Sequence, residues 1–599
     1  MSHRDRYRGR RRPRRRPPKG AIRPLPPIDL LTPPPQEPEV EASPDGELAS
    51  KPMSAEPSEP KSPPVATVEA RPAATPLALS PDFWLVMALL ALAAASFLPT
   101  LSAEFVWDDY ALIVDNPLVR RFADIAAIFS RPFLAARPNA YHPLVTLTYL
   151  TDFQVWRLNP VGYHTTNLTL HLVATLLVFA VATQLLRRRD MAFAAGAIFA
   201  AHPLHAQAVA WIAGRPQPLA TCLALFAFLA YSYYVQSFED PSNPRRRAPV
   251  YYWLGVTAFT LGLFAHASVA ALLVLLPLYE LTLARQRLSA HKRAWLLLPY
   301  LGFVAGGALY LIARWWALGY QLAPGLAVTA WPAHLYTIPL WAVRALELLI
   351  LPVRSQPYYP VALLDTPLRL DFLTAAAALV VMITLAVRAS TRSPVMAFAA
   401  WWTFLTLVPV LNFIPLSAPQ FAERDLYLPS VGVAIILGWA VISATTFAAA
   451  RGRRWMRALI IVVFAAAIGL GIGASRQRAL WYRDEATLFT QMVRSEPGSA
   501  LAHFNLGGAY LVRGNTEAAI REYRRAIELR PTAGTYHNLG NAYMAAGLYE
   551  EAAQAYRSAL LVEPRSQASA QGLRMALEAQ RTRLKPSAGQ PAQPTRDSS

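Results

Sequence analysis

The chain has 599 residues, of which 54% are apolar and only 16% are charged, whereas soluble domains average about a quarter charged residues. The apolar residues fall in blocks of about 17–25, the length that crosses the hydrocarbon core of a bilayer. The composition therefore excludes a wholly soluble protein and predicts a multi-pass membrane protein with soluble ends. The single cysteine, Cys222, lies in an apolar run, so the chain forms no intramolecular disulfide.

The formal net charge of +20 is concentrated at the N-terminus, where residues 1–20 hold nine Arg and one Lys against one Asp. Such a cluster binds nucleic acid in some proteins, and in others it stays cytoplasmic and touches anionic lipids. No RNA-binding fold or series of stacking aromatic residues follows, so we expect contact with membrane lipids and not with nucleic acid. Residues 1–80 are rich in Pro, Arg, Ser, Glu and Ala and are predicted to be disordered.

About eleven apolar segments have the length and composition of membrane-spanning helices. They cover residues 82–101, 163–186, 191–211, 217–236, 250–265, 268–285, 293–318, 371–387, 395–413, 430–449 and 456–474. Basic loops stay on the cytoplasmic side of a membrane, and Arg clusters follow several of these segments, for example at 187–189 and 451–457. We therefore expect a cell or inner membrane protein with a cytoplasmic N-terminus. Asp108, Asp109 and all residues after 475 would then lie outside, in a periplasm or lumen.

One further segment, 335–351, is apolar enough to cross the bilayer but contains Arg344 and Glu347. If it crossed, every later loop would change sides and two basic loops would lie outside. We therefore expect a partly buried or re-entrant helix on the outer side, which is tolerated only where protein or a water-filled cavity lines it.

The C-terminal region contains an internal repeat. Seven residues recur 33 positions later: Asn505, Gly507, Tyr510, Gly514, Tyr523, Ala526 and Pro531 correspond to Asn538, Gly540, Tyr543, Gly547, Tyr556, Ala559 and Pro564. This spacing and the Gly and Pro positions are typical of tetratricopeptide (TPR) repeats. We predict four regions: a disordered tail at 1–80, a transmembrane core at 81–478, two and a half repeats with a capping helix at 479–580, and a disordered tail at 581–599.

Two adjacent carboxylates, Asp108 and Asp109, directly follow the first apolar segment. Ionisable groups at a membrane boundary are costly to bury and often functional. They can act as a general base, or they can simply cap the helix that follows.

The motifs around this pair resemble those of the transmembrane and TPR repeat-containing (TMTC-like) protein glycosyltransferases, in the GT-C superfamily with the protein O-mannosyltransferases. The resemblance depends on motifs in a fixed order: Phe105 to Tyr110, Asn116-Pro117, Tyr141-His142-Pro143-Leu144, Gly162-Tyr163-His164, Asn167, His171, Phe199 to His205, Val209, Gly214-Arg215, Asn412-Phe413-Ile414-Pro415 and Ala422 to Ser430. It implies an all-α, GT-C-type membrane core. It also implies transfer of a sugar from a polyprenyl-phosphate donor to a protein hydroxyl on the outer side, with the repeats binding the acceptor polypeptide.

The resemblance also suggests roles for individual residues. Asp108 would be the base, and Asp109 would orient it or bind a metal. The candidate residues for the donor phosphate are Arg215, Arg424, His202, His205 and His266. Those for the substrate cavity are Trp107, His142, His164 and Glu423, and those for the acceptor are Asn505, Tyr510, Asn538 and Tyr543.

Structural alternatives stay open for several of these residues. Glu423 and Arg424 could form a salt bridge, and Arg215 could contact lipid head groups. His202 and His205 have a spacing that suits a metal, but no third ligand is set by spacing. No metal-ligating residue is therefore assigned, no cofactor is certain, and a divalent metal is left open.

Two departures from the family pattern remove charge near the expected site. Members often have Gly-Arg-x-Asp where this chain has Gly214-Arg215-Pro216-Gln217, and Lys-Glu where it has Ala265-His266-Ala267-Ser268. The alternative function is therefore a membrane-anchored TPR scaffold on a catalytically degenerate core.

Overall fold

The computed structural model describes residues 81–134, 139–238, 247–284, 297–319, 331–359, 363–391, 393–411 and 421–584. Within these ranges all regular secondary structure is helical, and no strand occurs. The tail at 1–80, the motif at 412–415, most of the basic loops near 245 and 290, and residues 585–599 lie outside the described residues, so the predictions made for them stay predictions.

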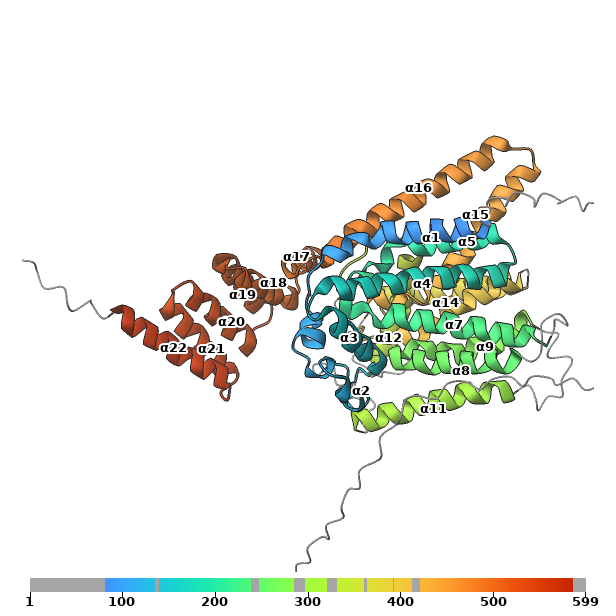
Figure 1. The fold of residues 1–599 in the computed structure, drawn as a ribbon. Helices are drawn as coiled ribbons and strands as arrows, with labels where there is room; N and C mark the ends of the chain where they lie inside the picture. Colours follow the sequence, from blue (N-terminus) through green and yellow to red (C-terminus); the bar gives the residue numbers. More distant parts are fainter. Residues whose placement is uncertain are drawn as a thin grey trace, which may run out of the picture. The chain divides into compact units, whose positions relative to one another are not determined.

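The membrane core is a bundle of helices whose axes run mostly alongside one another (Figure 1). Its helices are α1 (Pro81–Phe97), α4 (Pro160–Leu186), α5 (Arg189–Ala201), α7 (Pro216–Gln236), α8 (Ala248–Ala265), α9 (Leu272–Thr282), α11 (Leu298–Leu318), α12 (Trp331–Ile350), α13 (Leu370–Ser390), α14 (Pro394–Val410), α15 (Ser430–Ala450) and α16 (Arg454–Ala479). Several begin at a proline, whose missing N–H costs nothing in the first turn of a helix.

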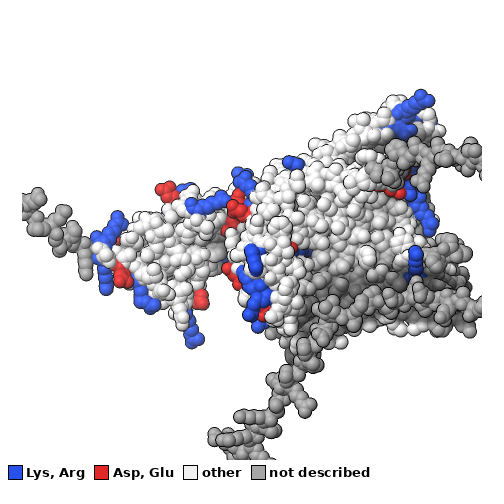
Figure 2. Space-filling model, in the orientation of Figure 1, with Lys and Arg blue, Asp and Glu red and all other residues white. Residues whose placement is uncertain are grey.

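Eight helices in the described residues are long and apolar enough to cross a membrane, and three shorter apolar helices accompany them. The chain is a multi-pass membrane protein. Figure 2 agrees, because the charged side chains on the face shown lie mostly at the ends of the bundle and on the repeat helices.

One predicted span is wrong. The helix expected over 191–211 stops at Ala201, because Pro203 follows and His202 takes an extended conformation. The chain then forms the short helices η5 (Pro203–His205), α6 (Ala206–Val209) and η6 (Ile212–Gly214). This break creates an irregular segment at the end of the bundle that carries Asp108.

The segment expected to be re-entrant is the 20-residue helix α12, which is long enough to be a candidate span. Near its start, the Tyr336 ring meets the Phe372 ring at the beginning of α13. At its end, the carbonyl of Leu349 lies 3.0 Å from Nε2 of His202. Which side of the membrane α12 occupies stays a prediction, as does the orientation of the whole chain.

The loop between α1 and α4 is built of short helices. Residues 117–133 form η3 (Pro117–Val119), η4 (Phe122–Asp124) and α2 (Ile125–Phe129), and α3 (Pro143–Trp156) follows.

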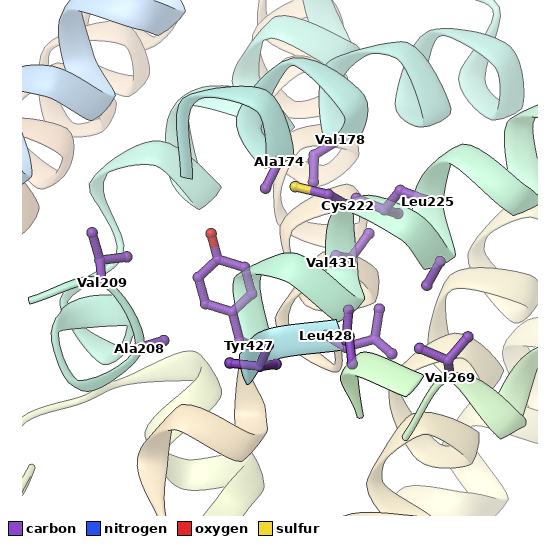
Figure 3. Close-up of a cluster of buried hydrophobic side chains, with 14 of the residues drawn as sticks. Ala174, Val178, Ala208, Val209, Cys222, Leu225, Val269, Tyr427, Leu428 and Val431 are labelled. Atoms are coloured by element: carbon purple, nitrogen blue, oxygen red, sulfur yellow. The ribbon is translucent and has the colours of Figure 1, made fainter. Parts of the chain in front are cut away.

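The core of the bundle is tightly packed where α4, α7 and α15 meet. Figure 3 shows Ala174 and Val178 of α4, Cys222 and Leu225 of α7, and Val431 of α15 gathered there with their side chains in contact range. At Gly438 of α15 a Cβ atom would lie 2.6 Å from the backbone nitrogen of Ala195 in α5, so only glycine allows these two helices to approach so closely.

The C-terminal region is the predicted helical repeat. Its helices are α17 (Glu485–Ser495), α18 (Ala500–Val512), α19 (Thr516–Leu529), α20 (Ala533–Ala545), α21 (Tyr549–Val562) and α22 (Gln567–Leu584). Most begin at a side-chain cap, for example Ser499 before α18 and Asn515 before α19. Tyr523 lies against Gly507, and Tyr556 lies against Gly540 in the same way one repeat later.

Candidate functional site

The carboxylate doublet lies in the loop that follows α1, and its two members have different environments. Asp109 is completely buried. Its Oδ2 accepts a hydrogen bond from the Val106 N–H at 3.0 Å, and its Oδ1 accepts one from the Ala213 N–H at 2.8 Å. Asp109 therefore connects the first loop to the segment that follows the break after α5. Burial raises its pKa to about 8 against the effect of these two bonds.

Asp108 is half-buried, whereas Asp109 is fully buried. Trp107, immediately before it, has a φ of 53°, a conformation that non-glycine residues rarely adopt. The Trp107 ring stacks on the Trp211 ring, with centroids 5.4 Å apart and an angle of 13° between the planes. Of the two acidic residues, only Asp108 keeps exposed surface, whereas Asp109 braces the loop.

An arginine extends this aromatic stack. The Arg424 guanidinium lies over the Trp211 ring, 5.3 Å from its centroid, and remains half-buried. Asp425, the next residue, accepts a 2.7 Å hydrogen bond from Nε2 of Gln217. Arg424 thus lies one ring away from Trp107 and presents a cation next to the loop that carries Asp108.

Two histidine rings stack beside this group. His142 and His266 have centroids 5.2 Å apart and nearly parallel planes, and both are half-buried. Nε2 of His266 lies 3.1 Å from Nε2 of Gln217. Burial lowers the pKa of His142 well below its ordinary value, and the neighbouring charges of Arg314 and Arg424 lower it further. Burial likewise lowers the pKa of His266, so both stacked imidazoles favour the neutral form.

Arg215 corrects a prediction, because it is a structural residue. It is fully buried, and its Nη1 forms a 2.6 Å ion pair with Asp152 Oδ2. Its Nε donates to Asn167 Oδ1 at 2.7 Å, and its Nη2 donates to the Tyr163 carbonyl at 2.9 Å. No face of this guanidinium is open to a phosphate.

His202 and His205 are also structural. Nδ1 of His202 accepts from the Leu204 N–H at 3.3 Å while Nε2 faces the Leu349 carbonyl. His205 is fully buried, with Nε2 3.0 Å from Ser430 Oγ and its ring against Tyr427. Both imidazoles are buried among these contacts, and the phosphate-binding role predicted for them stays a prediction.

Two residues expected to line the substrate cavity are also buried within the protein. His164 is buried against the backbone of Ala103 and Glu104. Glu423 is buried and accepts hydrogen bonds from the Gln356 N–H at 2.7 Å and from the hydroxyls of Ser355 and Tyr359. Glu423 therefore anchors the segment after α12 and forms no salt bridge with Arg424 among the contacts of the described residues.

The residues predicted to bind the acceptor lie on α18 and α20, where they mainly hold the repeats together. Tyr543 is buried, and its hydroxyl accepts two hydrogen bonds from Arg524, at 2.6 and 3.0 Å. The Asn538 side chain forms a hydrogen bond with the Tyr523 hydroxyl. Asn505 and Tyr510 are half-buried. A cavity of about 340 Å³ lies instead between the last repeat and α22, lined by His537, Asn541, Met544, Tyr556, Ala568, Gln571, Gly572 and Met575.

Two residues of the site were missed from the sequence. Asp425 follows Arg424 directly, but its role depends on Gln217, 208 positions away. Arg314 is buried within an otherwise apolar span, and an ionisable residue at such a position is itself a functional signal. Within the described ranges, no group of three or more His, Cys, Asp or Glu residues is placed to hold a metal ion.

The chain matches known proteins over most of its length. A Caenorhabditis elegans protein O-mannosyl-transferase is 25% identical over 75% of this chain, and the human protein O-mannosyl-transferase TMTC1 is 25% identical over 72%. The chain is a homologue of the TMTC protein O-mannosyltransferases. It spans 63% and 53% of the lengths of these two relatives.

Other matches cover the repeats, a short segment and the fold. Residues 507–547 and 533–566 match the family models "TPR repeat" and "Tetratricopeptide repeat", which confirms the repeats of this TMTC homologue. Drosophila melanogaster Tmtc1 is 39% identical over 24% of the chain and 17% of its own length. A crystal structure of ArnT from Cupriavidus metallidurans bound to undecaprenyl phosphate aligns over 84% of this chain and 89% of its own, at 13% identity and a TM-score of 0.36.

Proposed function

We propose that the chain is a membrane glycosyltransferase that moves a sugar from a polyprenyl-phosphate donor to a hydroxyl group of a polypeptide. One observation carries this proposal: the half-buried Asp108 adjoins a continuous stack of Trp107, Trp211 and Arg424. A carboxylate can act as the general base, and a cation can offset the charge of the leaving phosphate.

In the proposed reaction, Asp108 accepts the proton of the acceptor hydroxyl as its oxygen attacks the anomeric carbon. The bond from that carbon to the phosphate oxygen breaks, and the lipid phosphate leaves with the electron pair. Trp107 is the half-buried ring of this stack and is the one proposed to contact the sugar, since Trp211 is buried beneath it. Asp109, whose oxygens are occupied by backbone N–H groups, keeps the loop in place and takes no proton from the substrate.

The negative charge of the leaving phosphate needs cations close by. Arg424 is the candidate, because its half-buried side chain lies over the Trp211 ring beside the loop that carries Asp108. A guanidinium forms two parallel hydrogen bonds to phosphate oxygens, and the stacked His142 and His266 provide further polar contacts. Arg424 and His266 are therefore kept from the predicted phosphate ligands, and the buried Arg215, His202 and His205 are left out of the proposal.

The printed names of the relatives describe mannosyl transfer to protein, so mannose is the first donor sugar to test. The repeats would bind the acceptor polypeptide, with the cavity between α20, α21 and α22 as its contact. Their location on the same side of the membrane as Asp108 is supported by the contacts of α17 with that loop. Chelation with EDTA tests whether transfer needs a divalent metal at the donor phosphate.

The experiment is transfer of radiolabelled mannose from a polyprenyl phosphate to membrane-exposed polypeptides by the purified protein in nanodiscs. We expect Asp108→Asn to lower the rate by about 10²–10⁴-fold, the usual contribution of a general base. Asp115→Asn is the matched control, because Asp115 is exposed in the same loop. Equal rates for wild type and Asp108→Asn would reject the catalytic role.

The alternative, a TPR scaffold on an inactive core, is motivated by the missing charges at Gln217 and His266. It predicts that polypeptides bind to the repeats while neither transfer nor hydrolysis of the donor occurs with any polyprenyl-phosphate sugar. The same nanodisc preparation distinguishes the two functions, since release of free sugar from the donor needs a working site but no acceptor.

A further inference from the structure

The loop that carries Asp108 is contacted by α17, the first helix of the repeat region. The Trp107 N–H donates to Oε1 of Glu485 at 3.2 Å, a contact between residues 378 positions apart. The Glu104 N–H donates to the Arg483 carbonyl at 2.9 Å. The edge of the Phe489 ring meets the Trp107 ring at a centroid distance of 6.0 Å. Three contacts from one short segment therefore converge on the residues just before Asp108.

These contacts act on a stretch of backbone whose conformation is unfavourable without them. The left-handed φ of Trp107 is unfavourable for a bulky residue, and it persists only where the surroundings impose it. The Glu485 carboxylate holds the N–H of that residue, while Trp211 and Phe489 fix its ring from two sides. The side chain of Asp108 leaves the next Cα atom, so its direction follows from this conformation.

The segment around α17 is also tied to the next repeat helix (Figure 1). Asp484 caps α17 by accepting from the Thr487 N–H at 2.8 Å. The same carboxylate forms a 2.8 Å ion pair with Arg513, at the end of α18. A continuous set of contacts thus leads from the repeats through α17 to the catalytic loop.

We propose that Glu485 is a positioning residue for Asp108, through which the repeat region sets the direction of the catalytic carboxylate. This inference rests on the proposed function of Asp108 as the base. Glu485 acts by accepting a hydrogen bond from the Trp107 N–H. It contacts neither the sugar donor nor the acceptor polypeptide. The contacts of Glu485 thereby connect the repeat region, which binds the acceptor polypeptide, to the loop that carries the base Asp108.

The first test measures the position of residue 108 without any sugar transfer. A Cys222→Ala, Asp108→Cys protein has one thiol, and its alkylation by a membrane-impermeant maleimide reports how accessible that position is. We expect Glu485→Ala to change the alkylation rate by about threefold or more, because one hydrogen bond is worth about 1 kcal/mol. Glu485→Gln keeps the Oε1 acceptor and should restore the parent rate.

Glu517→Ala is the matched control, because Glu517 is also an acidic residue in the first turn of a repeat helix but is exposed. It removes the same helix-terminus charge without touching Trp107. An alkylation rate that Glu485→Ala leaves unchanged would overturn the inference. So would equal changes in the Glu485→Gln or Glu517→Ala proteins, since they would indicate general loosening of α17 or of the repeats.

The second test uses the native Asp108 in nanodiscs with polyprenyl-phosphate mannose. Glu485→Ala should lower kcat by about tenfold and leave the KM for the donor unchanged, since small displacements of a catalytic group slow the chemical step. Glu485→Gln should restore kcat, and a raised KM with normal kcat would contradict a positioning role. If the wild-type protein transfers no sugar, the proposed function fails, while the thiol measurement still decides whether Glu485 positions residue 108.

Discussion

Nε2 of Gln217 lies 3.1 Å from Nε2 of His266, so the two positions at which the sequence departs from its family pattern are in direct contact. Gln217 also donates to Asp425 at 2.7 Å. The contact places both departures in one polar network that also includes Asp425.

This relationship predicts the outcome of restoring the charges one at a time. Gln217→Asp removes the donor and places a second carboxylate next to Asp425, so we expect a loss of stability of about 1–3 kcal/mol and lower transfer activity. Adding His266→Lys to this variant should recover part of the lost stability and part of the lost activity, with a coupling energy of about 1 kcal/mol between the two substitutions. Thermal unfolding and mannose transfer measure the cycle, and additive effects would contradict it. Gln554→Asp, at an exposed position on α21, is the control for added charge.

The buried Asp109 predicts a pH dependence of stability. Its pKa is raised from 3.8 to about 8, so the folded state binds this proton more tightly than the unfolded state. The stability that it contributes is therefore fully present only below pH 3.8, and it decreases as the pH rises toward about 8. Unfolding of wild type and Asp109→Asn at about pH 5, 7 and 9 checks the sign, since the stability advantage of wild type should shrink between the first two values and level off above about pH 8. A difference that stays constant with pH would show that Asp109 is already ionised in the folded state.

The sequence was sufficient for the parts of the fold that depend on local composition. Spans follow from the length of apolar runs, and the repeat follows from residues such as Gly540 and Tyr556 that recur at a fixed shift and pack against each other. The break after Ala201 could also have been read from Pro203, which lacks the N–H that a continuing helix needs.

The site was less predictable, because a charged residue at a span end has the same appearance whether it faces a substrate or a buried partner. Arg215 was expected at a phosphate and instead pairs with Asp152 on α3. Glu423 was expected in a cavity and instead binds the segment after α12. In both cases the partner lies more than 60 positions away, and nothing in the local sequence identifies it.

Arg215 and Arg424 should therefore respond differently to the same substitution. Arg215→Met leaves Asp152 buried without its partner, and we expect a loss of stability of about 3–5 kcal/mol. Arg424→Met, at a half-buried position over Trp211, should change stability by less than about 1 kcal/mol and raise the KM for the donor. Thermal unfolding and donor titration of the two variants separate the roles. A raised donor KM with intact stability in Arg215→Met would restore the phosphate-binding prediction for that residue.

The packing of tyrosine on glycine within each repeat predicts a last pair of variants. A Cβ atom at residue 540 would lie 2.7 Å from the Tyr556 ring, which is buried, so Gly540→Ala must displace the ring and should cost about 1–3 kcal/mol. Gly534, in the first turn of the same helix α20, has no atom within 4 Å of such a Cβ. Gly534→Ala should therefore stabilise the repeats by up to about 1 kcal/mol, because alanine favours the helix. Thermal unfolding of both variants tests this contrast. If Gly540→Ala were as stable as Gly534→Ala, the ring of Tyr556 would have to be mobile, and the cavity that it lines beside α22 could not have a fixed shape for an acceptor.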